Sequence, residues 1–511
     1  MKLFSAQELK EWDAFTVQHE PIASIDLMER AATACMPHIL PHAIAATQVH
    51  ILCGPGNNGG DGLVIARLLS SANVHTQVIT IFNETEPSVD CITNLARLQG
   101  NQLVNIIDLE QLQQLPDFQT TDLVIDCLFG YGLNKPVSGI YKEVIDQVNA
   151  SKAYVVSIDM PSGLPADVLH PQTIGSYAVL QAQQTLTFQT LKHSLLFSET
   201  GAYAGKVHVI PIGMHAGYSG QARAHMELIT AQLVQSIIKT RQTFTHKGTQ
   251  GHVLLAGGSY GKMGAAILMA KGALYSGCGL LHVYAPKVGY TILQTAFPEA
   301  MVMTDDELYE IRNFPNLQGC SAAGIGPGMG MHAETIKTLG TNLPSIKIPV
   351  VLDADALNCC ATLLHEHHFS FRFPEQCIIT PHPKEFDRLA GYSSNSFERQ
   401  QKAHTFAQTH GVVVVLKGAY TRVCLPDGNI FVNTSGNPAM ATGGSGDVLT
   451  GLITSLLAQG YSTAQAAIAG VYIHGLAGDK AAAGKYAISA SEIAAAISPA
   501  MFHVIQGSGP Y

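Results

Sequence analysis

The sequence predicts an α/β protein built from two successive α/β domains. With 511 residues the chain is too long for one hydrophobic core, so two or three domains are expected. Short runs rich in β-branched residues, each followed by glycine and then by a helical pattern, occur in both halves of the chain. Charged residues make up only 13% of the chain, about half the usual ~25%, as large buried sheets flanked by alanine-rich helices would require.

The first half contains the strand-then-loop signal several times. Residues 48–54 predict a strand, and residues 63–70 predict the helix that follows it. Further strands are expected in VHTQVITIF (74–82), DLVIDCLFG (122–130) and AYVVSIDMPSG (153–163). Strands that alternate with helices imply a parallel sheet covered on both faces, so we expect a Rossmann-like doubly wound domain. Ligands of such sheets bind at the carboxyl ends of the strands.

The second half begins the same pattern again. Its expected elements are a strand at 252–256, a helix from about Met263, and strands at 322–326, 348–355, 376–383 and 411–418. Strand signals are weak over residues 214–245. We therefore expect a first domain at 1–215, a linker at 216–245 and a second α/β domain at 246–511.

Composition limits the possible partners and the cellular compartment. The net charge of −9 and the pI near 6.2 argue against a nucleic-acid partner, which would normally require a basic patch. Ten cysteines without a CxxC pair predict buried free thiols in a reducing compartment. No apolar segment of a secretory signal is visible at the N-terminus. The stretch from Asp447 to Asp479 is apolar but interrupted, so it predicts two buried helices and no membrane span. We expect a cytoplasmic protein.

Three loops of the first half share an acidic or amide residue after a strand. In GPGNNGGDG (54–62) the glycines would let the backbone approach a phosphate, and the amide and carboxylate side chains could bind as well. Alone, such a stretch would favour a generic strand-to-helix turn. Asp126 and Asp159 each end a predicted strand, where a single aspartate could simply cap a helix. Three such loops in order favour a binding site.

Together these loops resemble the N-terminal domain of the YjeF family, the NAD(P)H-hydrate epimerases. The resemblance covers about residues 1–215 and depends on GPGNNGGDG, DLVIDCLFGYGLNKP, SIDMPSG and TFQTLKHSL. It implies a substrate, NADH or NADPH hydrate, in which water has added to a nicotinamide double bond. The substrate-binding residues that it implies are Asn57, Asn58, Gly59, Gly60, Asp61, Gly130, Tyr131, Gly132, Leu133, Asn134, Lys135, Pro136, Tyr141 and Asp159. Asn58, Asp126 and Ser162 match the family's potassium ligands.

The chemistry of epimerisation needs an acid/base group. The hydrated carbon carries a hydroxyl and the ring nitrogen, whose lone pair can expel the hydroxyl and leave an iminium. Water can then return on the other face, with a proton exchanged beside the carbon. Asp159 is the expected acid/base residue. Lys192, in the looser motif TFQTLKHSL, is a second candidate for catalysis, and a structural role for it remains open.

The second glycine-rich stretch, GNPAMATGGSGDVLTG (436–451), predicts a site for phosphoryl transfer. Gly443, Gly444 and Gly446 could bind an anion with their backbone N–H groups at the start of a helix. Asp447 could take the proton of a hydroxyl that attacks a phosphoryl group. The alternative is an aspartate that only caps the helix.

This stretch resembles the GxGD motif of the ribokinase-like superfamily, and within it the ADP-dependent NAD(P)H-hydrate dehydratases. The match covers about residues 245–505, with Ser445 in place of the common threonine. Its motifs are GGSYGKMGA, GIGPGMG, VLDADALN, TPHPKEF, LKGAYT and GNPAMATGGSGDVLTG. The resemblance implies that the nucleotide is bound by Lys417, Gly418, Ala419, Tyr420, Thr421 and Gly446, and the hydrated dinucleotide by Ala265, Gly328, His382 and Asp447. Glu385 either orders Mg²⁺ through water or is a plain surface carboxylate.

The two resemblances predict a bifunctional repair enzyme, an isomerase and a lyase on one chain. The first domain would interconvert the R and S hydrates of NAD(P)H. The second would phosphorylate the hydroxyl of the S hydrate, with ADP favoured over ATP by the resemblance alone, and then eliminate phosphate. The family also implies a homo-oligomer. A ribokinase-like small-molecule kinase with a non-catalytic N-terminal binding module is the alternative.

Overall fold

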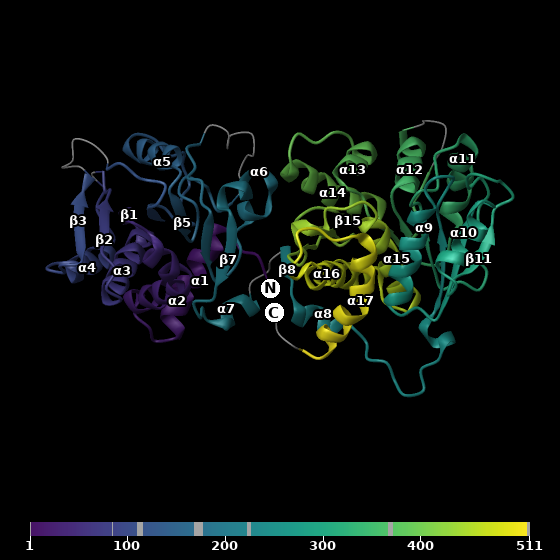
Figure 1. Cartoon of the computed structure of the whole chain (residues 1–511), viewed down its shortest axis with the longest axis horizontal. Coiled ribbons are helices and arrows are strands. Elements are labelled where there is room, and N and C mark those ends of the chain that lie inside the picture. Colours follow the sequence, from purple (N-terminus) through teal and green to yellow (C-terminus); the bar gives the residue numbers. More distant parts are fainter. Residues whose placement is uncertain are drawn as a thin grey trace. The chain divides into compact units, whose positions relative to one another are not determined.

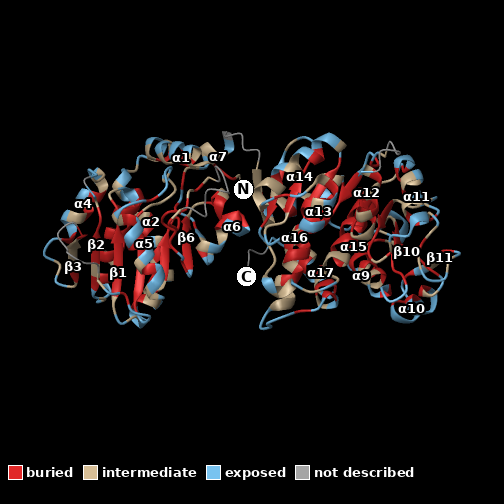
Figure 2. Ribbon diagram, turned by 90° about the horizontal axis from the view of Figure 1, so that it is seen from above, coloured by how far each residue is buried: buried red, intermediate tan, exposed pale blue. Residues whose placement is uncertain are grey.

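The computed structural model describes residues 2–83, 85–109, 116–167, 177–221, 226–365 and 371–507. The chain forms two compact units, one of which comprises residues 2–224 and the other most of the rest. Each unit contains one large sheet, and the strands of both sheets are mostly buried (Figures 1 and 2). The predicted α/β class is confirmed for both halves.

The N-terminal unit is a doubly wound parallel sheet of seven strands in the order β3-β2-β1-β4-β5-β6-β7. Its strands are β1 (Val49–Cys53), β2 (Thr76–Thr80), β3 (Val104–Asp108), β4 (Leu123–Cys127), β5 (Tyr154–Ile158), β6 (Gln184–Phe188) and β7 (Lys206–Ile210). The order reverses between β1 and β4, so the chain leaves these neighbouring strands in opposite directions and opens a crevice at their carboxyl ends.

Helices cover both faces of this sheet. They are α1 (Ala6–His19), α2 (Ser24–Ala45), α3 (Asn57–Ser71), α4 (Val89–Leu98), α5 (Ile140–Ser151), α6 (Ser198–Gly201) and α7 (Ala216–Gln221). Apolar residues of α1, α2 and α3 share one core with the sheet, whereas α5 packs in a separate core on the opposite face (Figure 1). Helices therefore shield both faces of the central strands from solvent, which explains why β1 and β4 are buried along their whole length.

The second unit contains a ten-stranded mixed sheet in the order β11-β10-β9-β12-β13-β14-β15-β16-β17-β8. Its strands are β8 (Met226–Ile229), β9 (His252–Ala256), β10 (Leu280–Ala285), β11 (Met301–Thr304), β12 (Ala322–Ile325), β13 (Val350–Leu352), β14 (Cys377–Ile379), β15 (Val413–Leu416), β16 (Arg422–Cys424) and β17 (Ile430–Asn433). The strands from β11 to β15 are parallel, and β16 runs antiparallel to both of its neighbours.

Helices also cover both faces of the second sheet. They are α8 (Ala231–Ile237), α9 (Met263–Tyr275), α10 (Gly289–Ala296), α11 (Ala333–Asn342), α12 (Asp355–His365), α13 (Pro383–Ala390), α14 (Ser396–His410), α15 (Ser445–Ala458), α16 (Thr463–Ala482) and α17 (Ala490–Ile505). Helices α9, α15, α16 and α17 pack together on one face and form the largest part of its core (Figure 1). The apolar stretch after Asp447 forms two buried helices, as predicted.

The expected linker at 216–245 is not a linker over most of its length. Strand β8 pairs in parallel with β17, so residues 226–229 form the edge of the second sheet. Helix α8 follows it and buries Val234 in the core of the same unit. A four-residue edge strand, MELI, is too short to produce a recognisable periodic signal, which is why the sequence suggested a connection.

Two further expectations concern the cysteines and the membrane. All ten cysteines are unpaired, and all are buried except the half-buried Cys320. This confirms the prediction of buried free thiols. Within the described residues, no helix combines the length and the apolar character needed to cross a membrane.

Candidate active sites

The glycines of GPGNNGGDG serve close packing between α3 and the sheet. A Cβ on Gly62 would lie 2.8 Å from both Cβ of Cys127 and Sγ of Cys53, and a Cβ on Gly54 would lie 2.1 Å from the carbonyl oxygen of Leu128. Helix α3 therefore begins at Asn57, inside the glycine stretch, and six residues earlier than the helix predicted at 63–70. Gly56 and Asn57 are exposed at the carboxyl end of β1, where the loop faces open space.

Asp126 and Ser162, two of the expected cation ligands, are in direct contact. The Ser162 hydroxyl donates to Oδ1 of Asp126 at 2.5 Å, and the Ser162 backbone N–H donates to Oδ2 at 2.9 Å. The Ser157 hydroxyl donates to Oδ2 as well, at 2.8 Å. Burial raises the pKa of Asp126, and these hydrogen bonds oppose that shift. Asp126 thus fastens the loop after β5 to the end of β4.

Asn58, the third expected ligand, has an unsatisfied side chain. The residue is 9% exposed, and among the described residues neither Oδ1 nor Nδ2 has a hydrogen-bond partner. A buried amide without partners is costly, so the Asn58 side chain is suited to bind a further group. A Cβ built on Gly130 would lie 3.5 Å from Cβ of Asn58 and 3.0 Å from Oδ2 of Asp159. Asn58 and Asp159 therefore both lie close to Gly130.

Asp159 and Lys192 form a buried ion pair. The distance from Nζ of Lys192 to Oδ1 of Asp159 is 2.5 Å, with side-chain exposures of 2% and 3%. The ammonium group also donates to the Thr187 hydroxyl at 2.9 Å and to the Phe188 carbonyl at 2.8 Å. Asp159 has a positive φ of 65°, an uncommon backbone conformation that is found more often at functional sites. The two expected catalytic residues of this unit are brought together.

Tyr131 connects this pair to further acidic groups. Its backbone N–H donates to Oδ2 of Asp159 at 2.8 Å, and its hydroxyl donates to Asp13. Burial raises the pKa of Asp13. Burial, with Asp159 and Asp13 nearby, also raises the pKa of Asp61 well above its usual range. Asp13 was missed by the sequence analysis, because it lies on α1, far from every glycine-rich motif.

The other expected substrate-binding residues of this unit differ in exposure. Gly132, Asn134, Lys135 and Pro136 lie exposed in the loop after β4, and Leu133 is half-buried. Tyr141 lies on α5 and is buried; its hydroxyl donates to the Ile81 carbonyl at 3.0 Å. The ring of Tyr141 packs in the core beneath α5, so the side chain helps to hold this helix against the sheet.

A cleft of about 470 Å³ opens in the second unit beside the start of α15. It brings together Ala265, Gly328 and Asp447, three of the residues expected to contact the hydrated dinucleotide. Its walls are Gly261, Lys262, Gly264, Ala265, Leu268, Gly328, Asp355, Gly443, Gly444 and Asp447. Gly444 precedes α15 with a φ of 90°, which favours glycine. This cleft is the candidate active site of the second unit.

Asp447 lies in the first turn of α15 and has a perturbed pKa. Burial, together with the nearby Asp353, raises the pKa of Asp447 to about 7, although Lys417 opposes the shift. A carboxyl group that changes charge near neutral pH can accept and release a proton under working conditions. Asp447 is therefore suited to act as a general base.

Lys417 lies among carboxylates below the glycine loop. Its Nζ is 2.8 Å from Oδ1 of Asp353 and 3.9 Å from Oε2 of Glu385. Burial would lower the pKa of Lys417, but Asp353 and Glu385 raise it overall, so the group stays charged. A Cβ on Gly446 would lie 3.2 Å from this Nζ, so the ammonium group reaches the start of α15. Thr450 donates to the second oxygen of Asp353 at 2.7 Å.

His382 and Glu385 form a capping box at the start of α13. His382 Nδ1 accepts from the backbone N–H groups of Lys384 and Glu385, and the His382 backbone N–H donates to Glu385 Oε2 at 2.8 Å. Glu385 is only 6% exposed, so the alternative of a plain surface carboxylate is wrong. The His382 side chain is 44% exposed. It is not among the residues that line the cleft.

The remaining expected nucleotide-binding residues form the turn after β15. The Gly418 backbone N–H donates to the Thr421 hydroxyl, which donates in turn to the Gly418 carbonyl at 3.0 Å. Gly418 and Ala419 are exposed, while Tyr420 is half-buried. The turn directly follows Lys417 in the sequence. Asp353 and Thr450 were missed as site residues, although Thr450 lies one helical turn after Gly446 and shares its face of α15.

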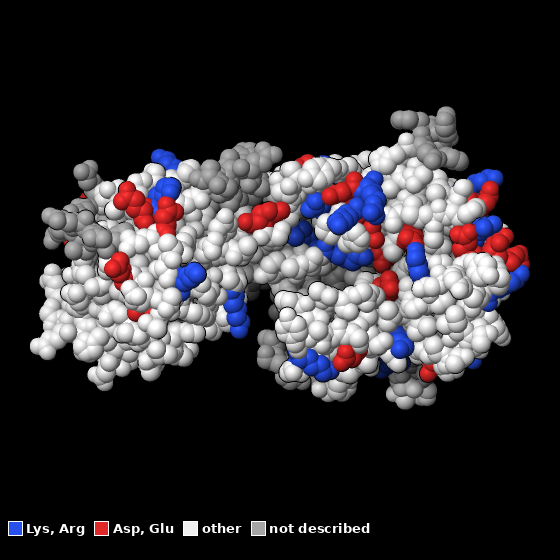
Figure 3. All heavy atoms as spheres, turned by 45° about the horizontal axis from the view of Figure 1, so that its top comes forward, with Lys and Arg blue, Asp and Glu red and all other residues white. Residues whose placement is uncertain are grey.

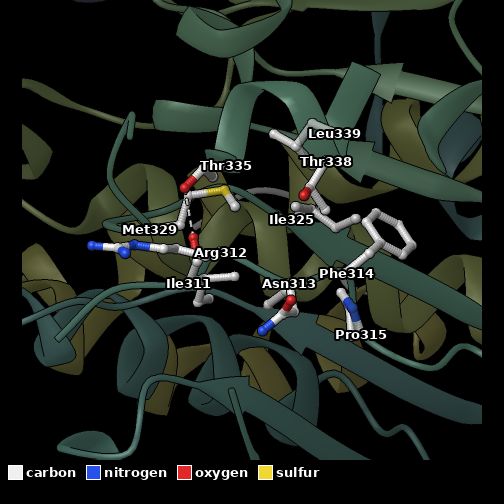
Figure 4. A pocket seen from close by; sticks show the side chains of 11 residues that line it. Ile311, Arg312, Asn313, Phe314, Pro315, Ile325, Met329, Thr335, Thr338 and Leu339 are labelled. Carbon is white, nitrogen blue, oxygen red and sulfur yellow. Dashed lines mark hydrogen bonds between the residues drawn. The ribbon is translucent and has the colours of Figure 1, made fainter. Parts of the chain in front are cut away.

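A second cavity in this unit is too small to be an active site. It encloses about 10 Å³ between β12, α11 and the segment 311–315, which is room for at most one water molecule (Figure 4). Its lining includes Ile311, Ile325, Met329 and Leu339. The guanidinium group of Arg312 extends away from it and pairs with Glu310.

On the face shown in Figure 3, basic side chains are interspersed with acidic ones.

Two family matches cover most of the chain. Residues 24–194 match the family described as YjeF-related protein N-terminus, and residues 253–499 match the NAD(P)H-hydrate dehydratase family. The chain is 35% identical over 502 residues to the bifunctional NAD(P)H-hydrate repair enzyme Nnr of Moorella thermoacetica, covering 94% of this chain and 93% of that protein. It is 34% identical over 437 residues to the enzyme of the same name from Escherichia coli K12, covering 85% and 80%.

Solved structures also resemble part of the chain. The ADP/ATP-dependent NAD(P)H-hydrate dehydratase of Bacillus subtilis, co-crystallised with ATP/Mg²⁺, is 29% identical and covers 54% of this chain and 98% of its own, with a TM-score of 0.47. A ribokinase-like superfamily protein of Enterococcus faecalis is 28% identical and covers 56% and 98%, with a TM-score of 0.49.

Proposed function

The chain belongs to the family of bifunctional NAD(P)H-hydrate repair enzymes, and from this premise we propose how its residues divide the work. The protein repairs hydrated NADH and NADPH. Its N-terminal unit is an NAD(P)H-hydrate epimerase, and its second unit is an ADP/ATP-dependent NAD(P)H-hydrate dehydratase. The placement of Asp447 in the first turn of α15, beside the cleft and with a pKa raised by burial, most directly supports our assignment of the dehydratase residues.

For dehydration we assign Asp447 as the base. Its carboxylate takes the proton of the hydrate's hydroxyl, whose oxygen attacks the terminal phosphorus of the nucleotide while the bond to the bridging oxygen breaks. Backbone N–H groups of the glycine loop and the Lys417 ammonium group stabilise the negative charge on the phosphoryl group during its transfer. The ring nitrogen then expels phosphate, and loss of a proton from the adjacent ring carbon restores the double bond. Phosphorylation turns a poor leaving group into a good one.

We propose that ADP is the phosphoryl donor and that Mg²⁺ binds together with it. ATP is the alternative donor, and the assay described below compares the two. Asp353, Glu385 and Asp447 surround the single ammonium group of Lys417, which leaves excess negative charge in the site. Oxygen ligands of this kind suit Mg²⁺, which would neutralise charge on the nucleotide phosphates. Glu385 is the residue we expect to orient its water. Gly418, Ala419, Tyr420, Thr421 and Gly446 would contact the nucleotide, and Ala265, Gly328 and His382 the hydrate.

For epimerisation we assign Asp159 as the acid/base group and Lys192 as the residue that pairs with its carboxylate and orients it. Asp159 removes and returns the proton of the exchanging water at the hydrated carbon. Residues 57–61 and 130–136, with Tyr141, would hold the dinucleotide. We propose K⁺ at Asn58, Asp126 and Ser162. The unpartnered Oδ1 of Asn58 and the carboxylate of Asp126 are the oxygen ligands that a hard cation prefers, and the ion would add positive charge to the site.

The dehydration assay tests the proposed function. Separated R and S hydrates of NADH are incubated with the protein, Mg²⁺ and either ADP or ATP, and absorbance of the reduced nicotinamide is followed. The S hydrate should be converted at once, and the R hydrate only as fast as it epimerises. Accumulation of a phosphorylated hydrate without recovery of NADH would instead identify a small-molecule kinase.

We further propose a cytoplasmic homo-oligomer, on the basis of the free thiols and the family resemblance.

A further inference from the structure

Helix α16 makes a set of contacts to the glycine loop that the assignment above does not use. The loop runs from Gly436 to Asp447, and residues 474–479 of α16 touch it at both ends. His474 Nε2 lies 3.0 Å from the carbonyl oxygen of Ser445, two residues before Asp447. Asp479 accepts from the Gly436 backbone N–H at 2.9 Å and from the Asn437 side chain at 2.7 Å.

Two glycines allow α16 to approach the loop this closely. A Cβ on Gly475 would lie 2.2 Å from Oγ of Ser435, and a Cβ on Gly478 would lie 2.1 Å from Sδ of Met440. The Ser435 hydroxyl donates to the Tyr472 carbonyl of the same helix at 2.9 Å. Because α16 is itself packed in the core, the loop rests along one rigid helical face.

The His474 contact supports the direction in which the first peptide group of α15 faces. A carbonyl can only accept, so the Nε2 of His474 must carry the proton and donate it. Burial lowers the pKa of His474 to about 4, so the ring is neutral at physiological pH. The Ser445 carbonyl and the Gly446 N–H belong to one planar trans peptide and point in opposite directions. Holding the carbonyl toward His474 therefore keeps the Gly446 N–H pointing away from His474.

We propose that His474 and Asp479 are positioning residues of the dehydratase, which aim the Gly446 N–H and the Asp447 carboxylate at the phosphoryl group by fixing both ends of the loop. This inference rests on the proposed dehydratase function. Neither side chain touches a reactant in this scheme; each acts through the loop. The loop is too rich in glycine to keep one conformation alone, so an external support explains its fixed geometry.

The test compares two amides at position 474. The Nε2 of glutamine can reach the position of the histidine Nε2, whereas asparagine is one methylene shorter and cannot. His474→Gln should keep kcat for dehydration within about threefold of the wild type, and His474→Asn should lose about 10²-fold in kcat with a smaller change in KM, because a displaced donor is missed mainly in the transition state. Equal kcat values for the two variants would overturn the proposal.

Controls separate this effect from general destabilisation. His404 makes the same kind of contact, Nε2 to the Gly428 carbonyl at 3.0 Å, on α14 of the same unit, so His404→Asn should leave dehydration unchanged. The Tm of each variant reports whether the second unit is still folded, and its rate of epimerisation reports on the N-terminal unit. If His474→Asn does not fold, Asp479→Asn takes its place in the test. The asparagine keeps one acceptor oxygen, so it can retain only one of the two contacts with Gly436 and Asn437. An unchanged kcat for Asp479→Asn would also overturn the proposal. If the wild type itself fails to dehydrate the S hydrate, the proposed function is wrong, not this inference alone.

Discussion

The side chains of Asp159 and Lys192 form an ion pair that is almost completely buried, with 2.5 Å between Oδ1 and Nζ. Removing the carboxylate should stop epimerisation. Asp159→Asn keeps the side-chain volume but cannot act as a base, so we expect the rate of R/S exchange to fall at least about 10²-fold. Dehydration of the S hydrate by the same chain should be unchanged and serves as the control. R/S exchange at the wild-type rate would remove Asp159 from its acid/base role.

The unsatisfied amide of Asn58 allows a test of the cation site. Asn58→Ala removes no hydrogen bond within the described residues, so the free energy of unfolding should change by less than about 1 kcal/mol. The K⁺ concentration that gives half-maximal epimerase activity should rise severalfold. Asn94 is the matched control: it is 2% exposed and its amide donates to Met28 Sδ. Asn94→Ala should lower stability without changing the response to K⁺.

The pKa of Asp447, about 7, predicts the pH dependence of dehydration. The base must be a carboxylate, so kcat/KM should fall about tenfold per pH unit below about pH 7 and level off above it. Measurement with purified S hydrate excludes the epimerase step. A profile that stays flat down to about pH 5 would contradict the assignment of Asp447 as the base.

The same shift predicts the effect of Asp447 on stability. Its folded-state pKa lies above the ordinary value of 3.8, so the folded chain binds more protons than the unfolded one between these values. The contribution of Asp447 to the free energy of unfolding therefore falls as pH rises from about 4 to 7. Asp447→Asn should abolish dehydration and yet raise the Tm at pH 8, whereas at pH 4 the Tm of variant and wild type should nearly coincide. A lower Tm for the variant at pH 8 would contradict this explanation.

The packing of α3 against the sheet predicts a large cost for a single methyl group. A Cβ on Gly62 would meet Cβ of Cys127 and Sγ of Cys53 at 2.8 Å, and neither strand can move freely. Gly62→Ala should lower the free energy of unfolding by about 1–3 kcal/mol, measured by denaturant titration. Gly220, on α7 of the same unit, has nothing within 4 Å of its Cβ position. Gly220→Ala should leave stability unchanged or slightly improve it.

The predictable parts of the fold are those with strong local signals. The strands at 49–53 and 123–127 are apolar, bounded by turn residues and buried on both faces, so their sequence shows them clearly. The start of α3 was placed too late, because glycine is a poor helix former and its presence there serves contacts with distant strands. Strand β8 was missed because it is short and lies at the edge of its sheet.

The site residues that were missed depend on contacts between distant parts of the chain. Asp13 reaches Tyr131 only because α1 packs near the loop after β4, and no local pattern around Asp13 indicates this. Asp353 lies in the motif VLDADALN, but its contacts with Lys417 and Thr450 exist only once β13, β15 and α15 are assembled. Asp126, Asp159 and Asp447 could be found because each follows or precedes a glycine loop.

The burial of the cysteines has a consequence for life under oxidative stress. The thiolate is the form that reacts with peroxides, and burial raises the pKa of every cysteine in the chain. Nine of the ten thiols are also out of reach of a reagent in solvent, with Cys320 as the half-buried exception. The folded chain should therefore keep its repair activity at peroxide concentrations that inactivate enzymes with a nucleophilic thiol.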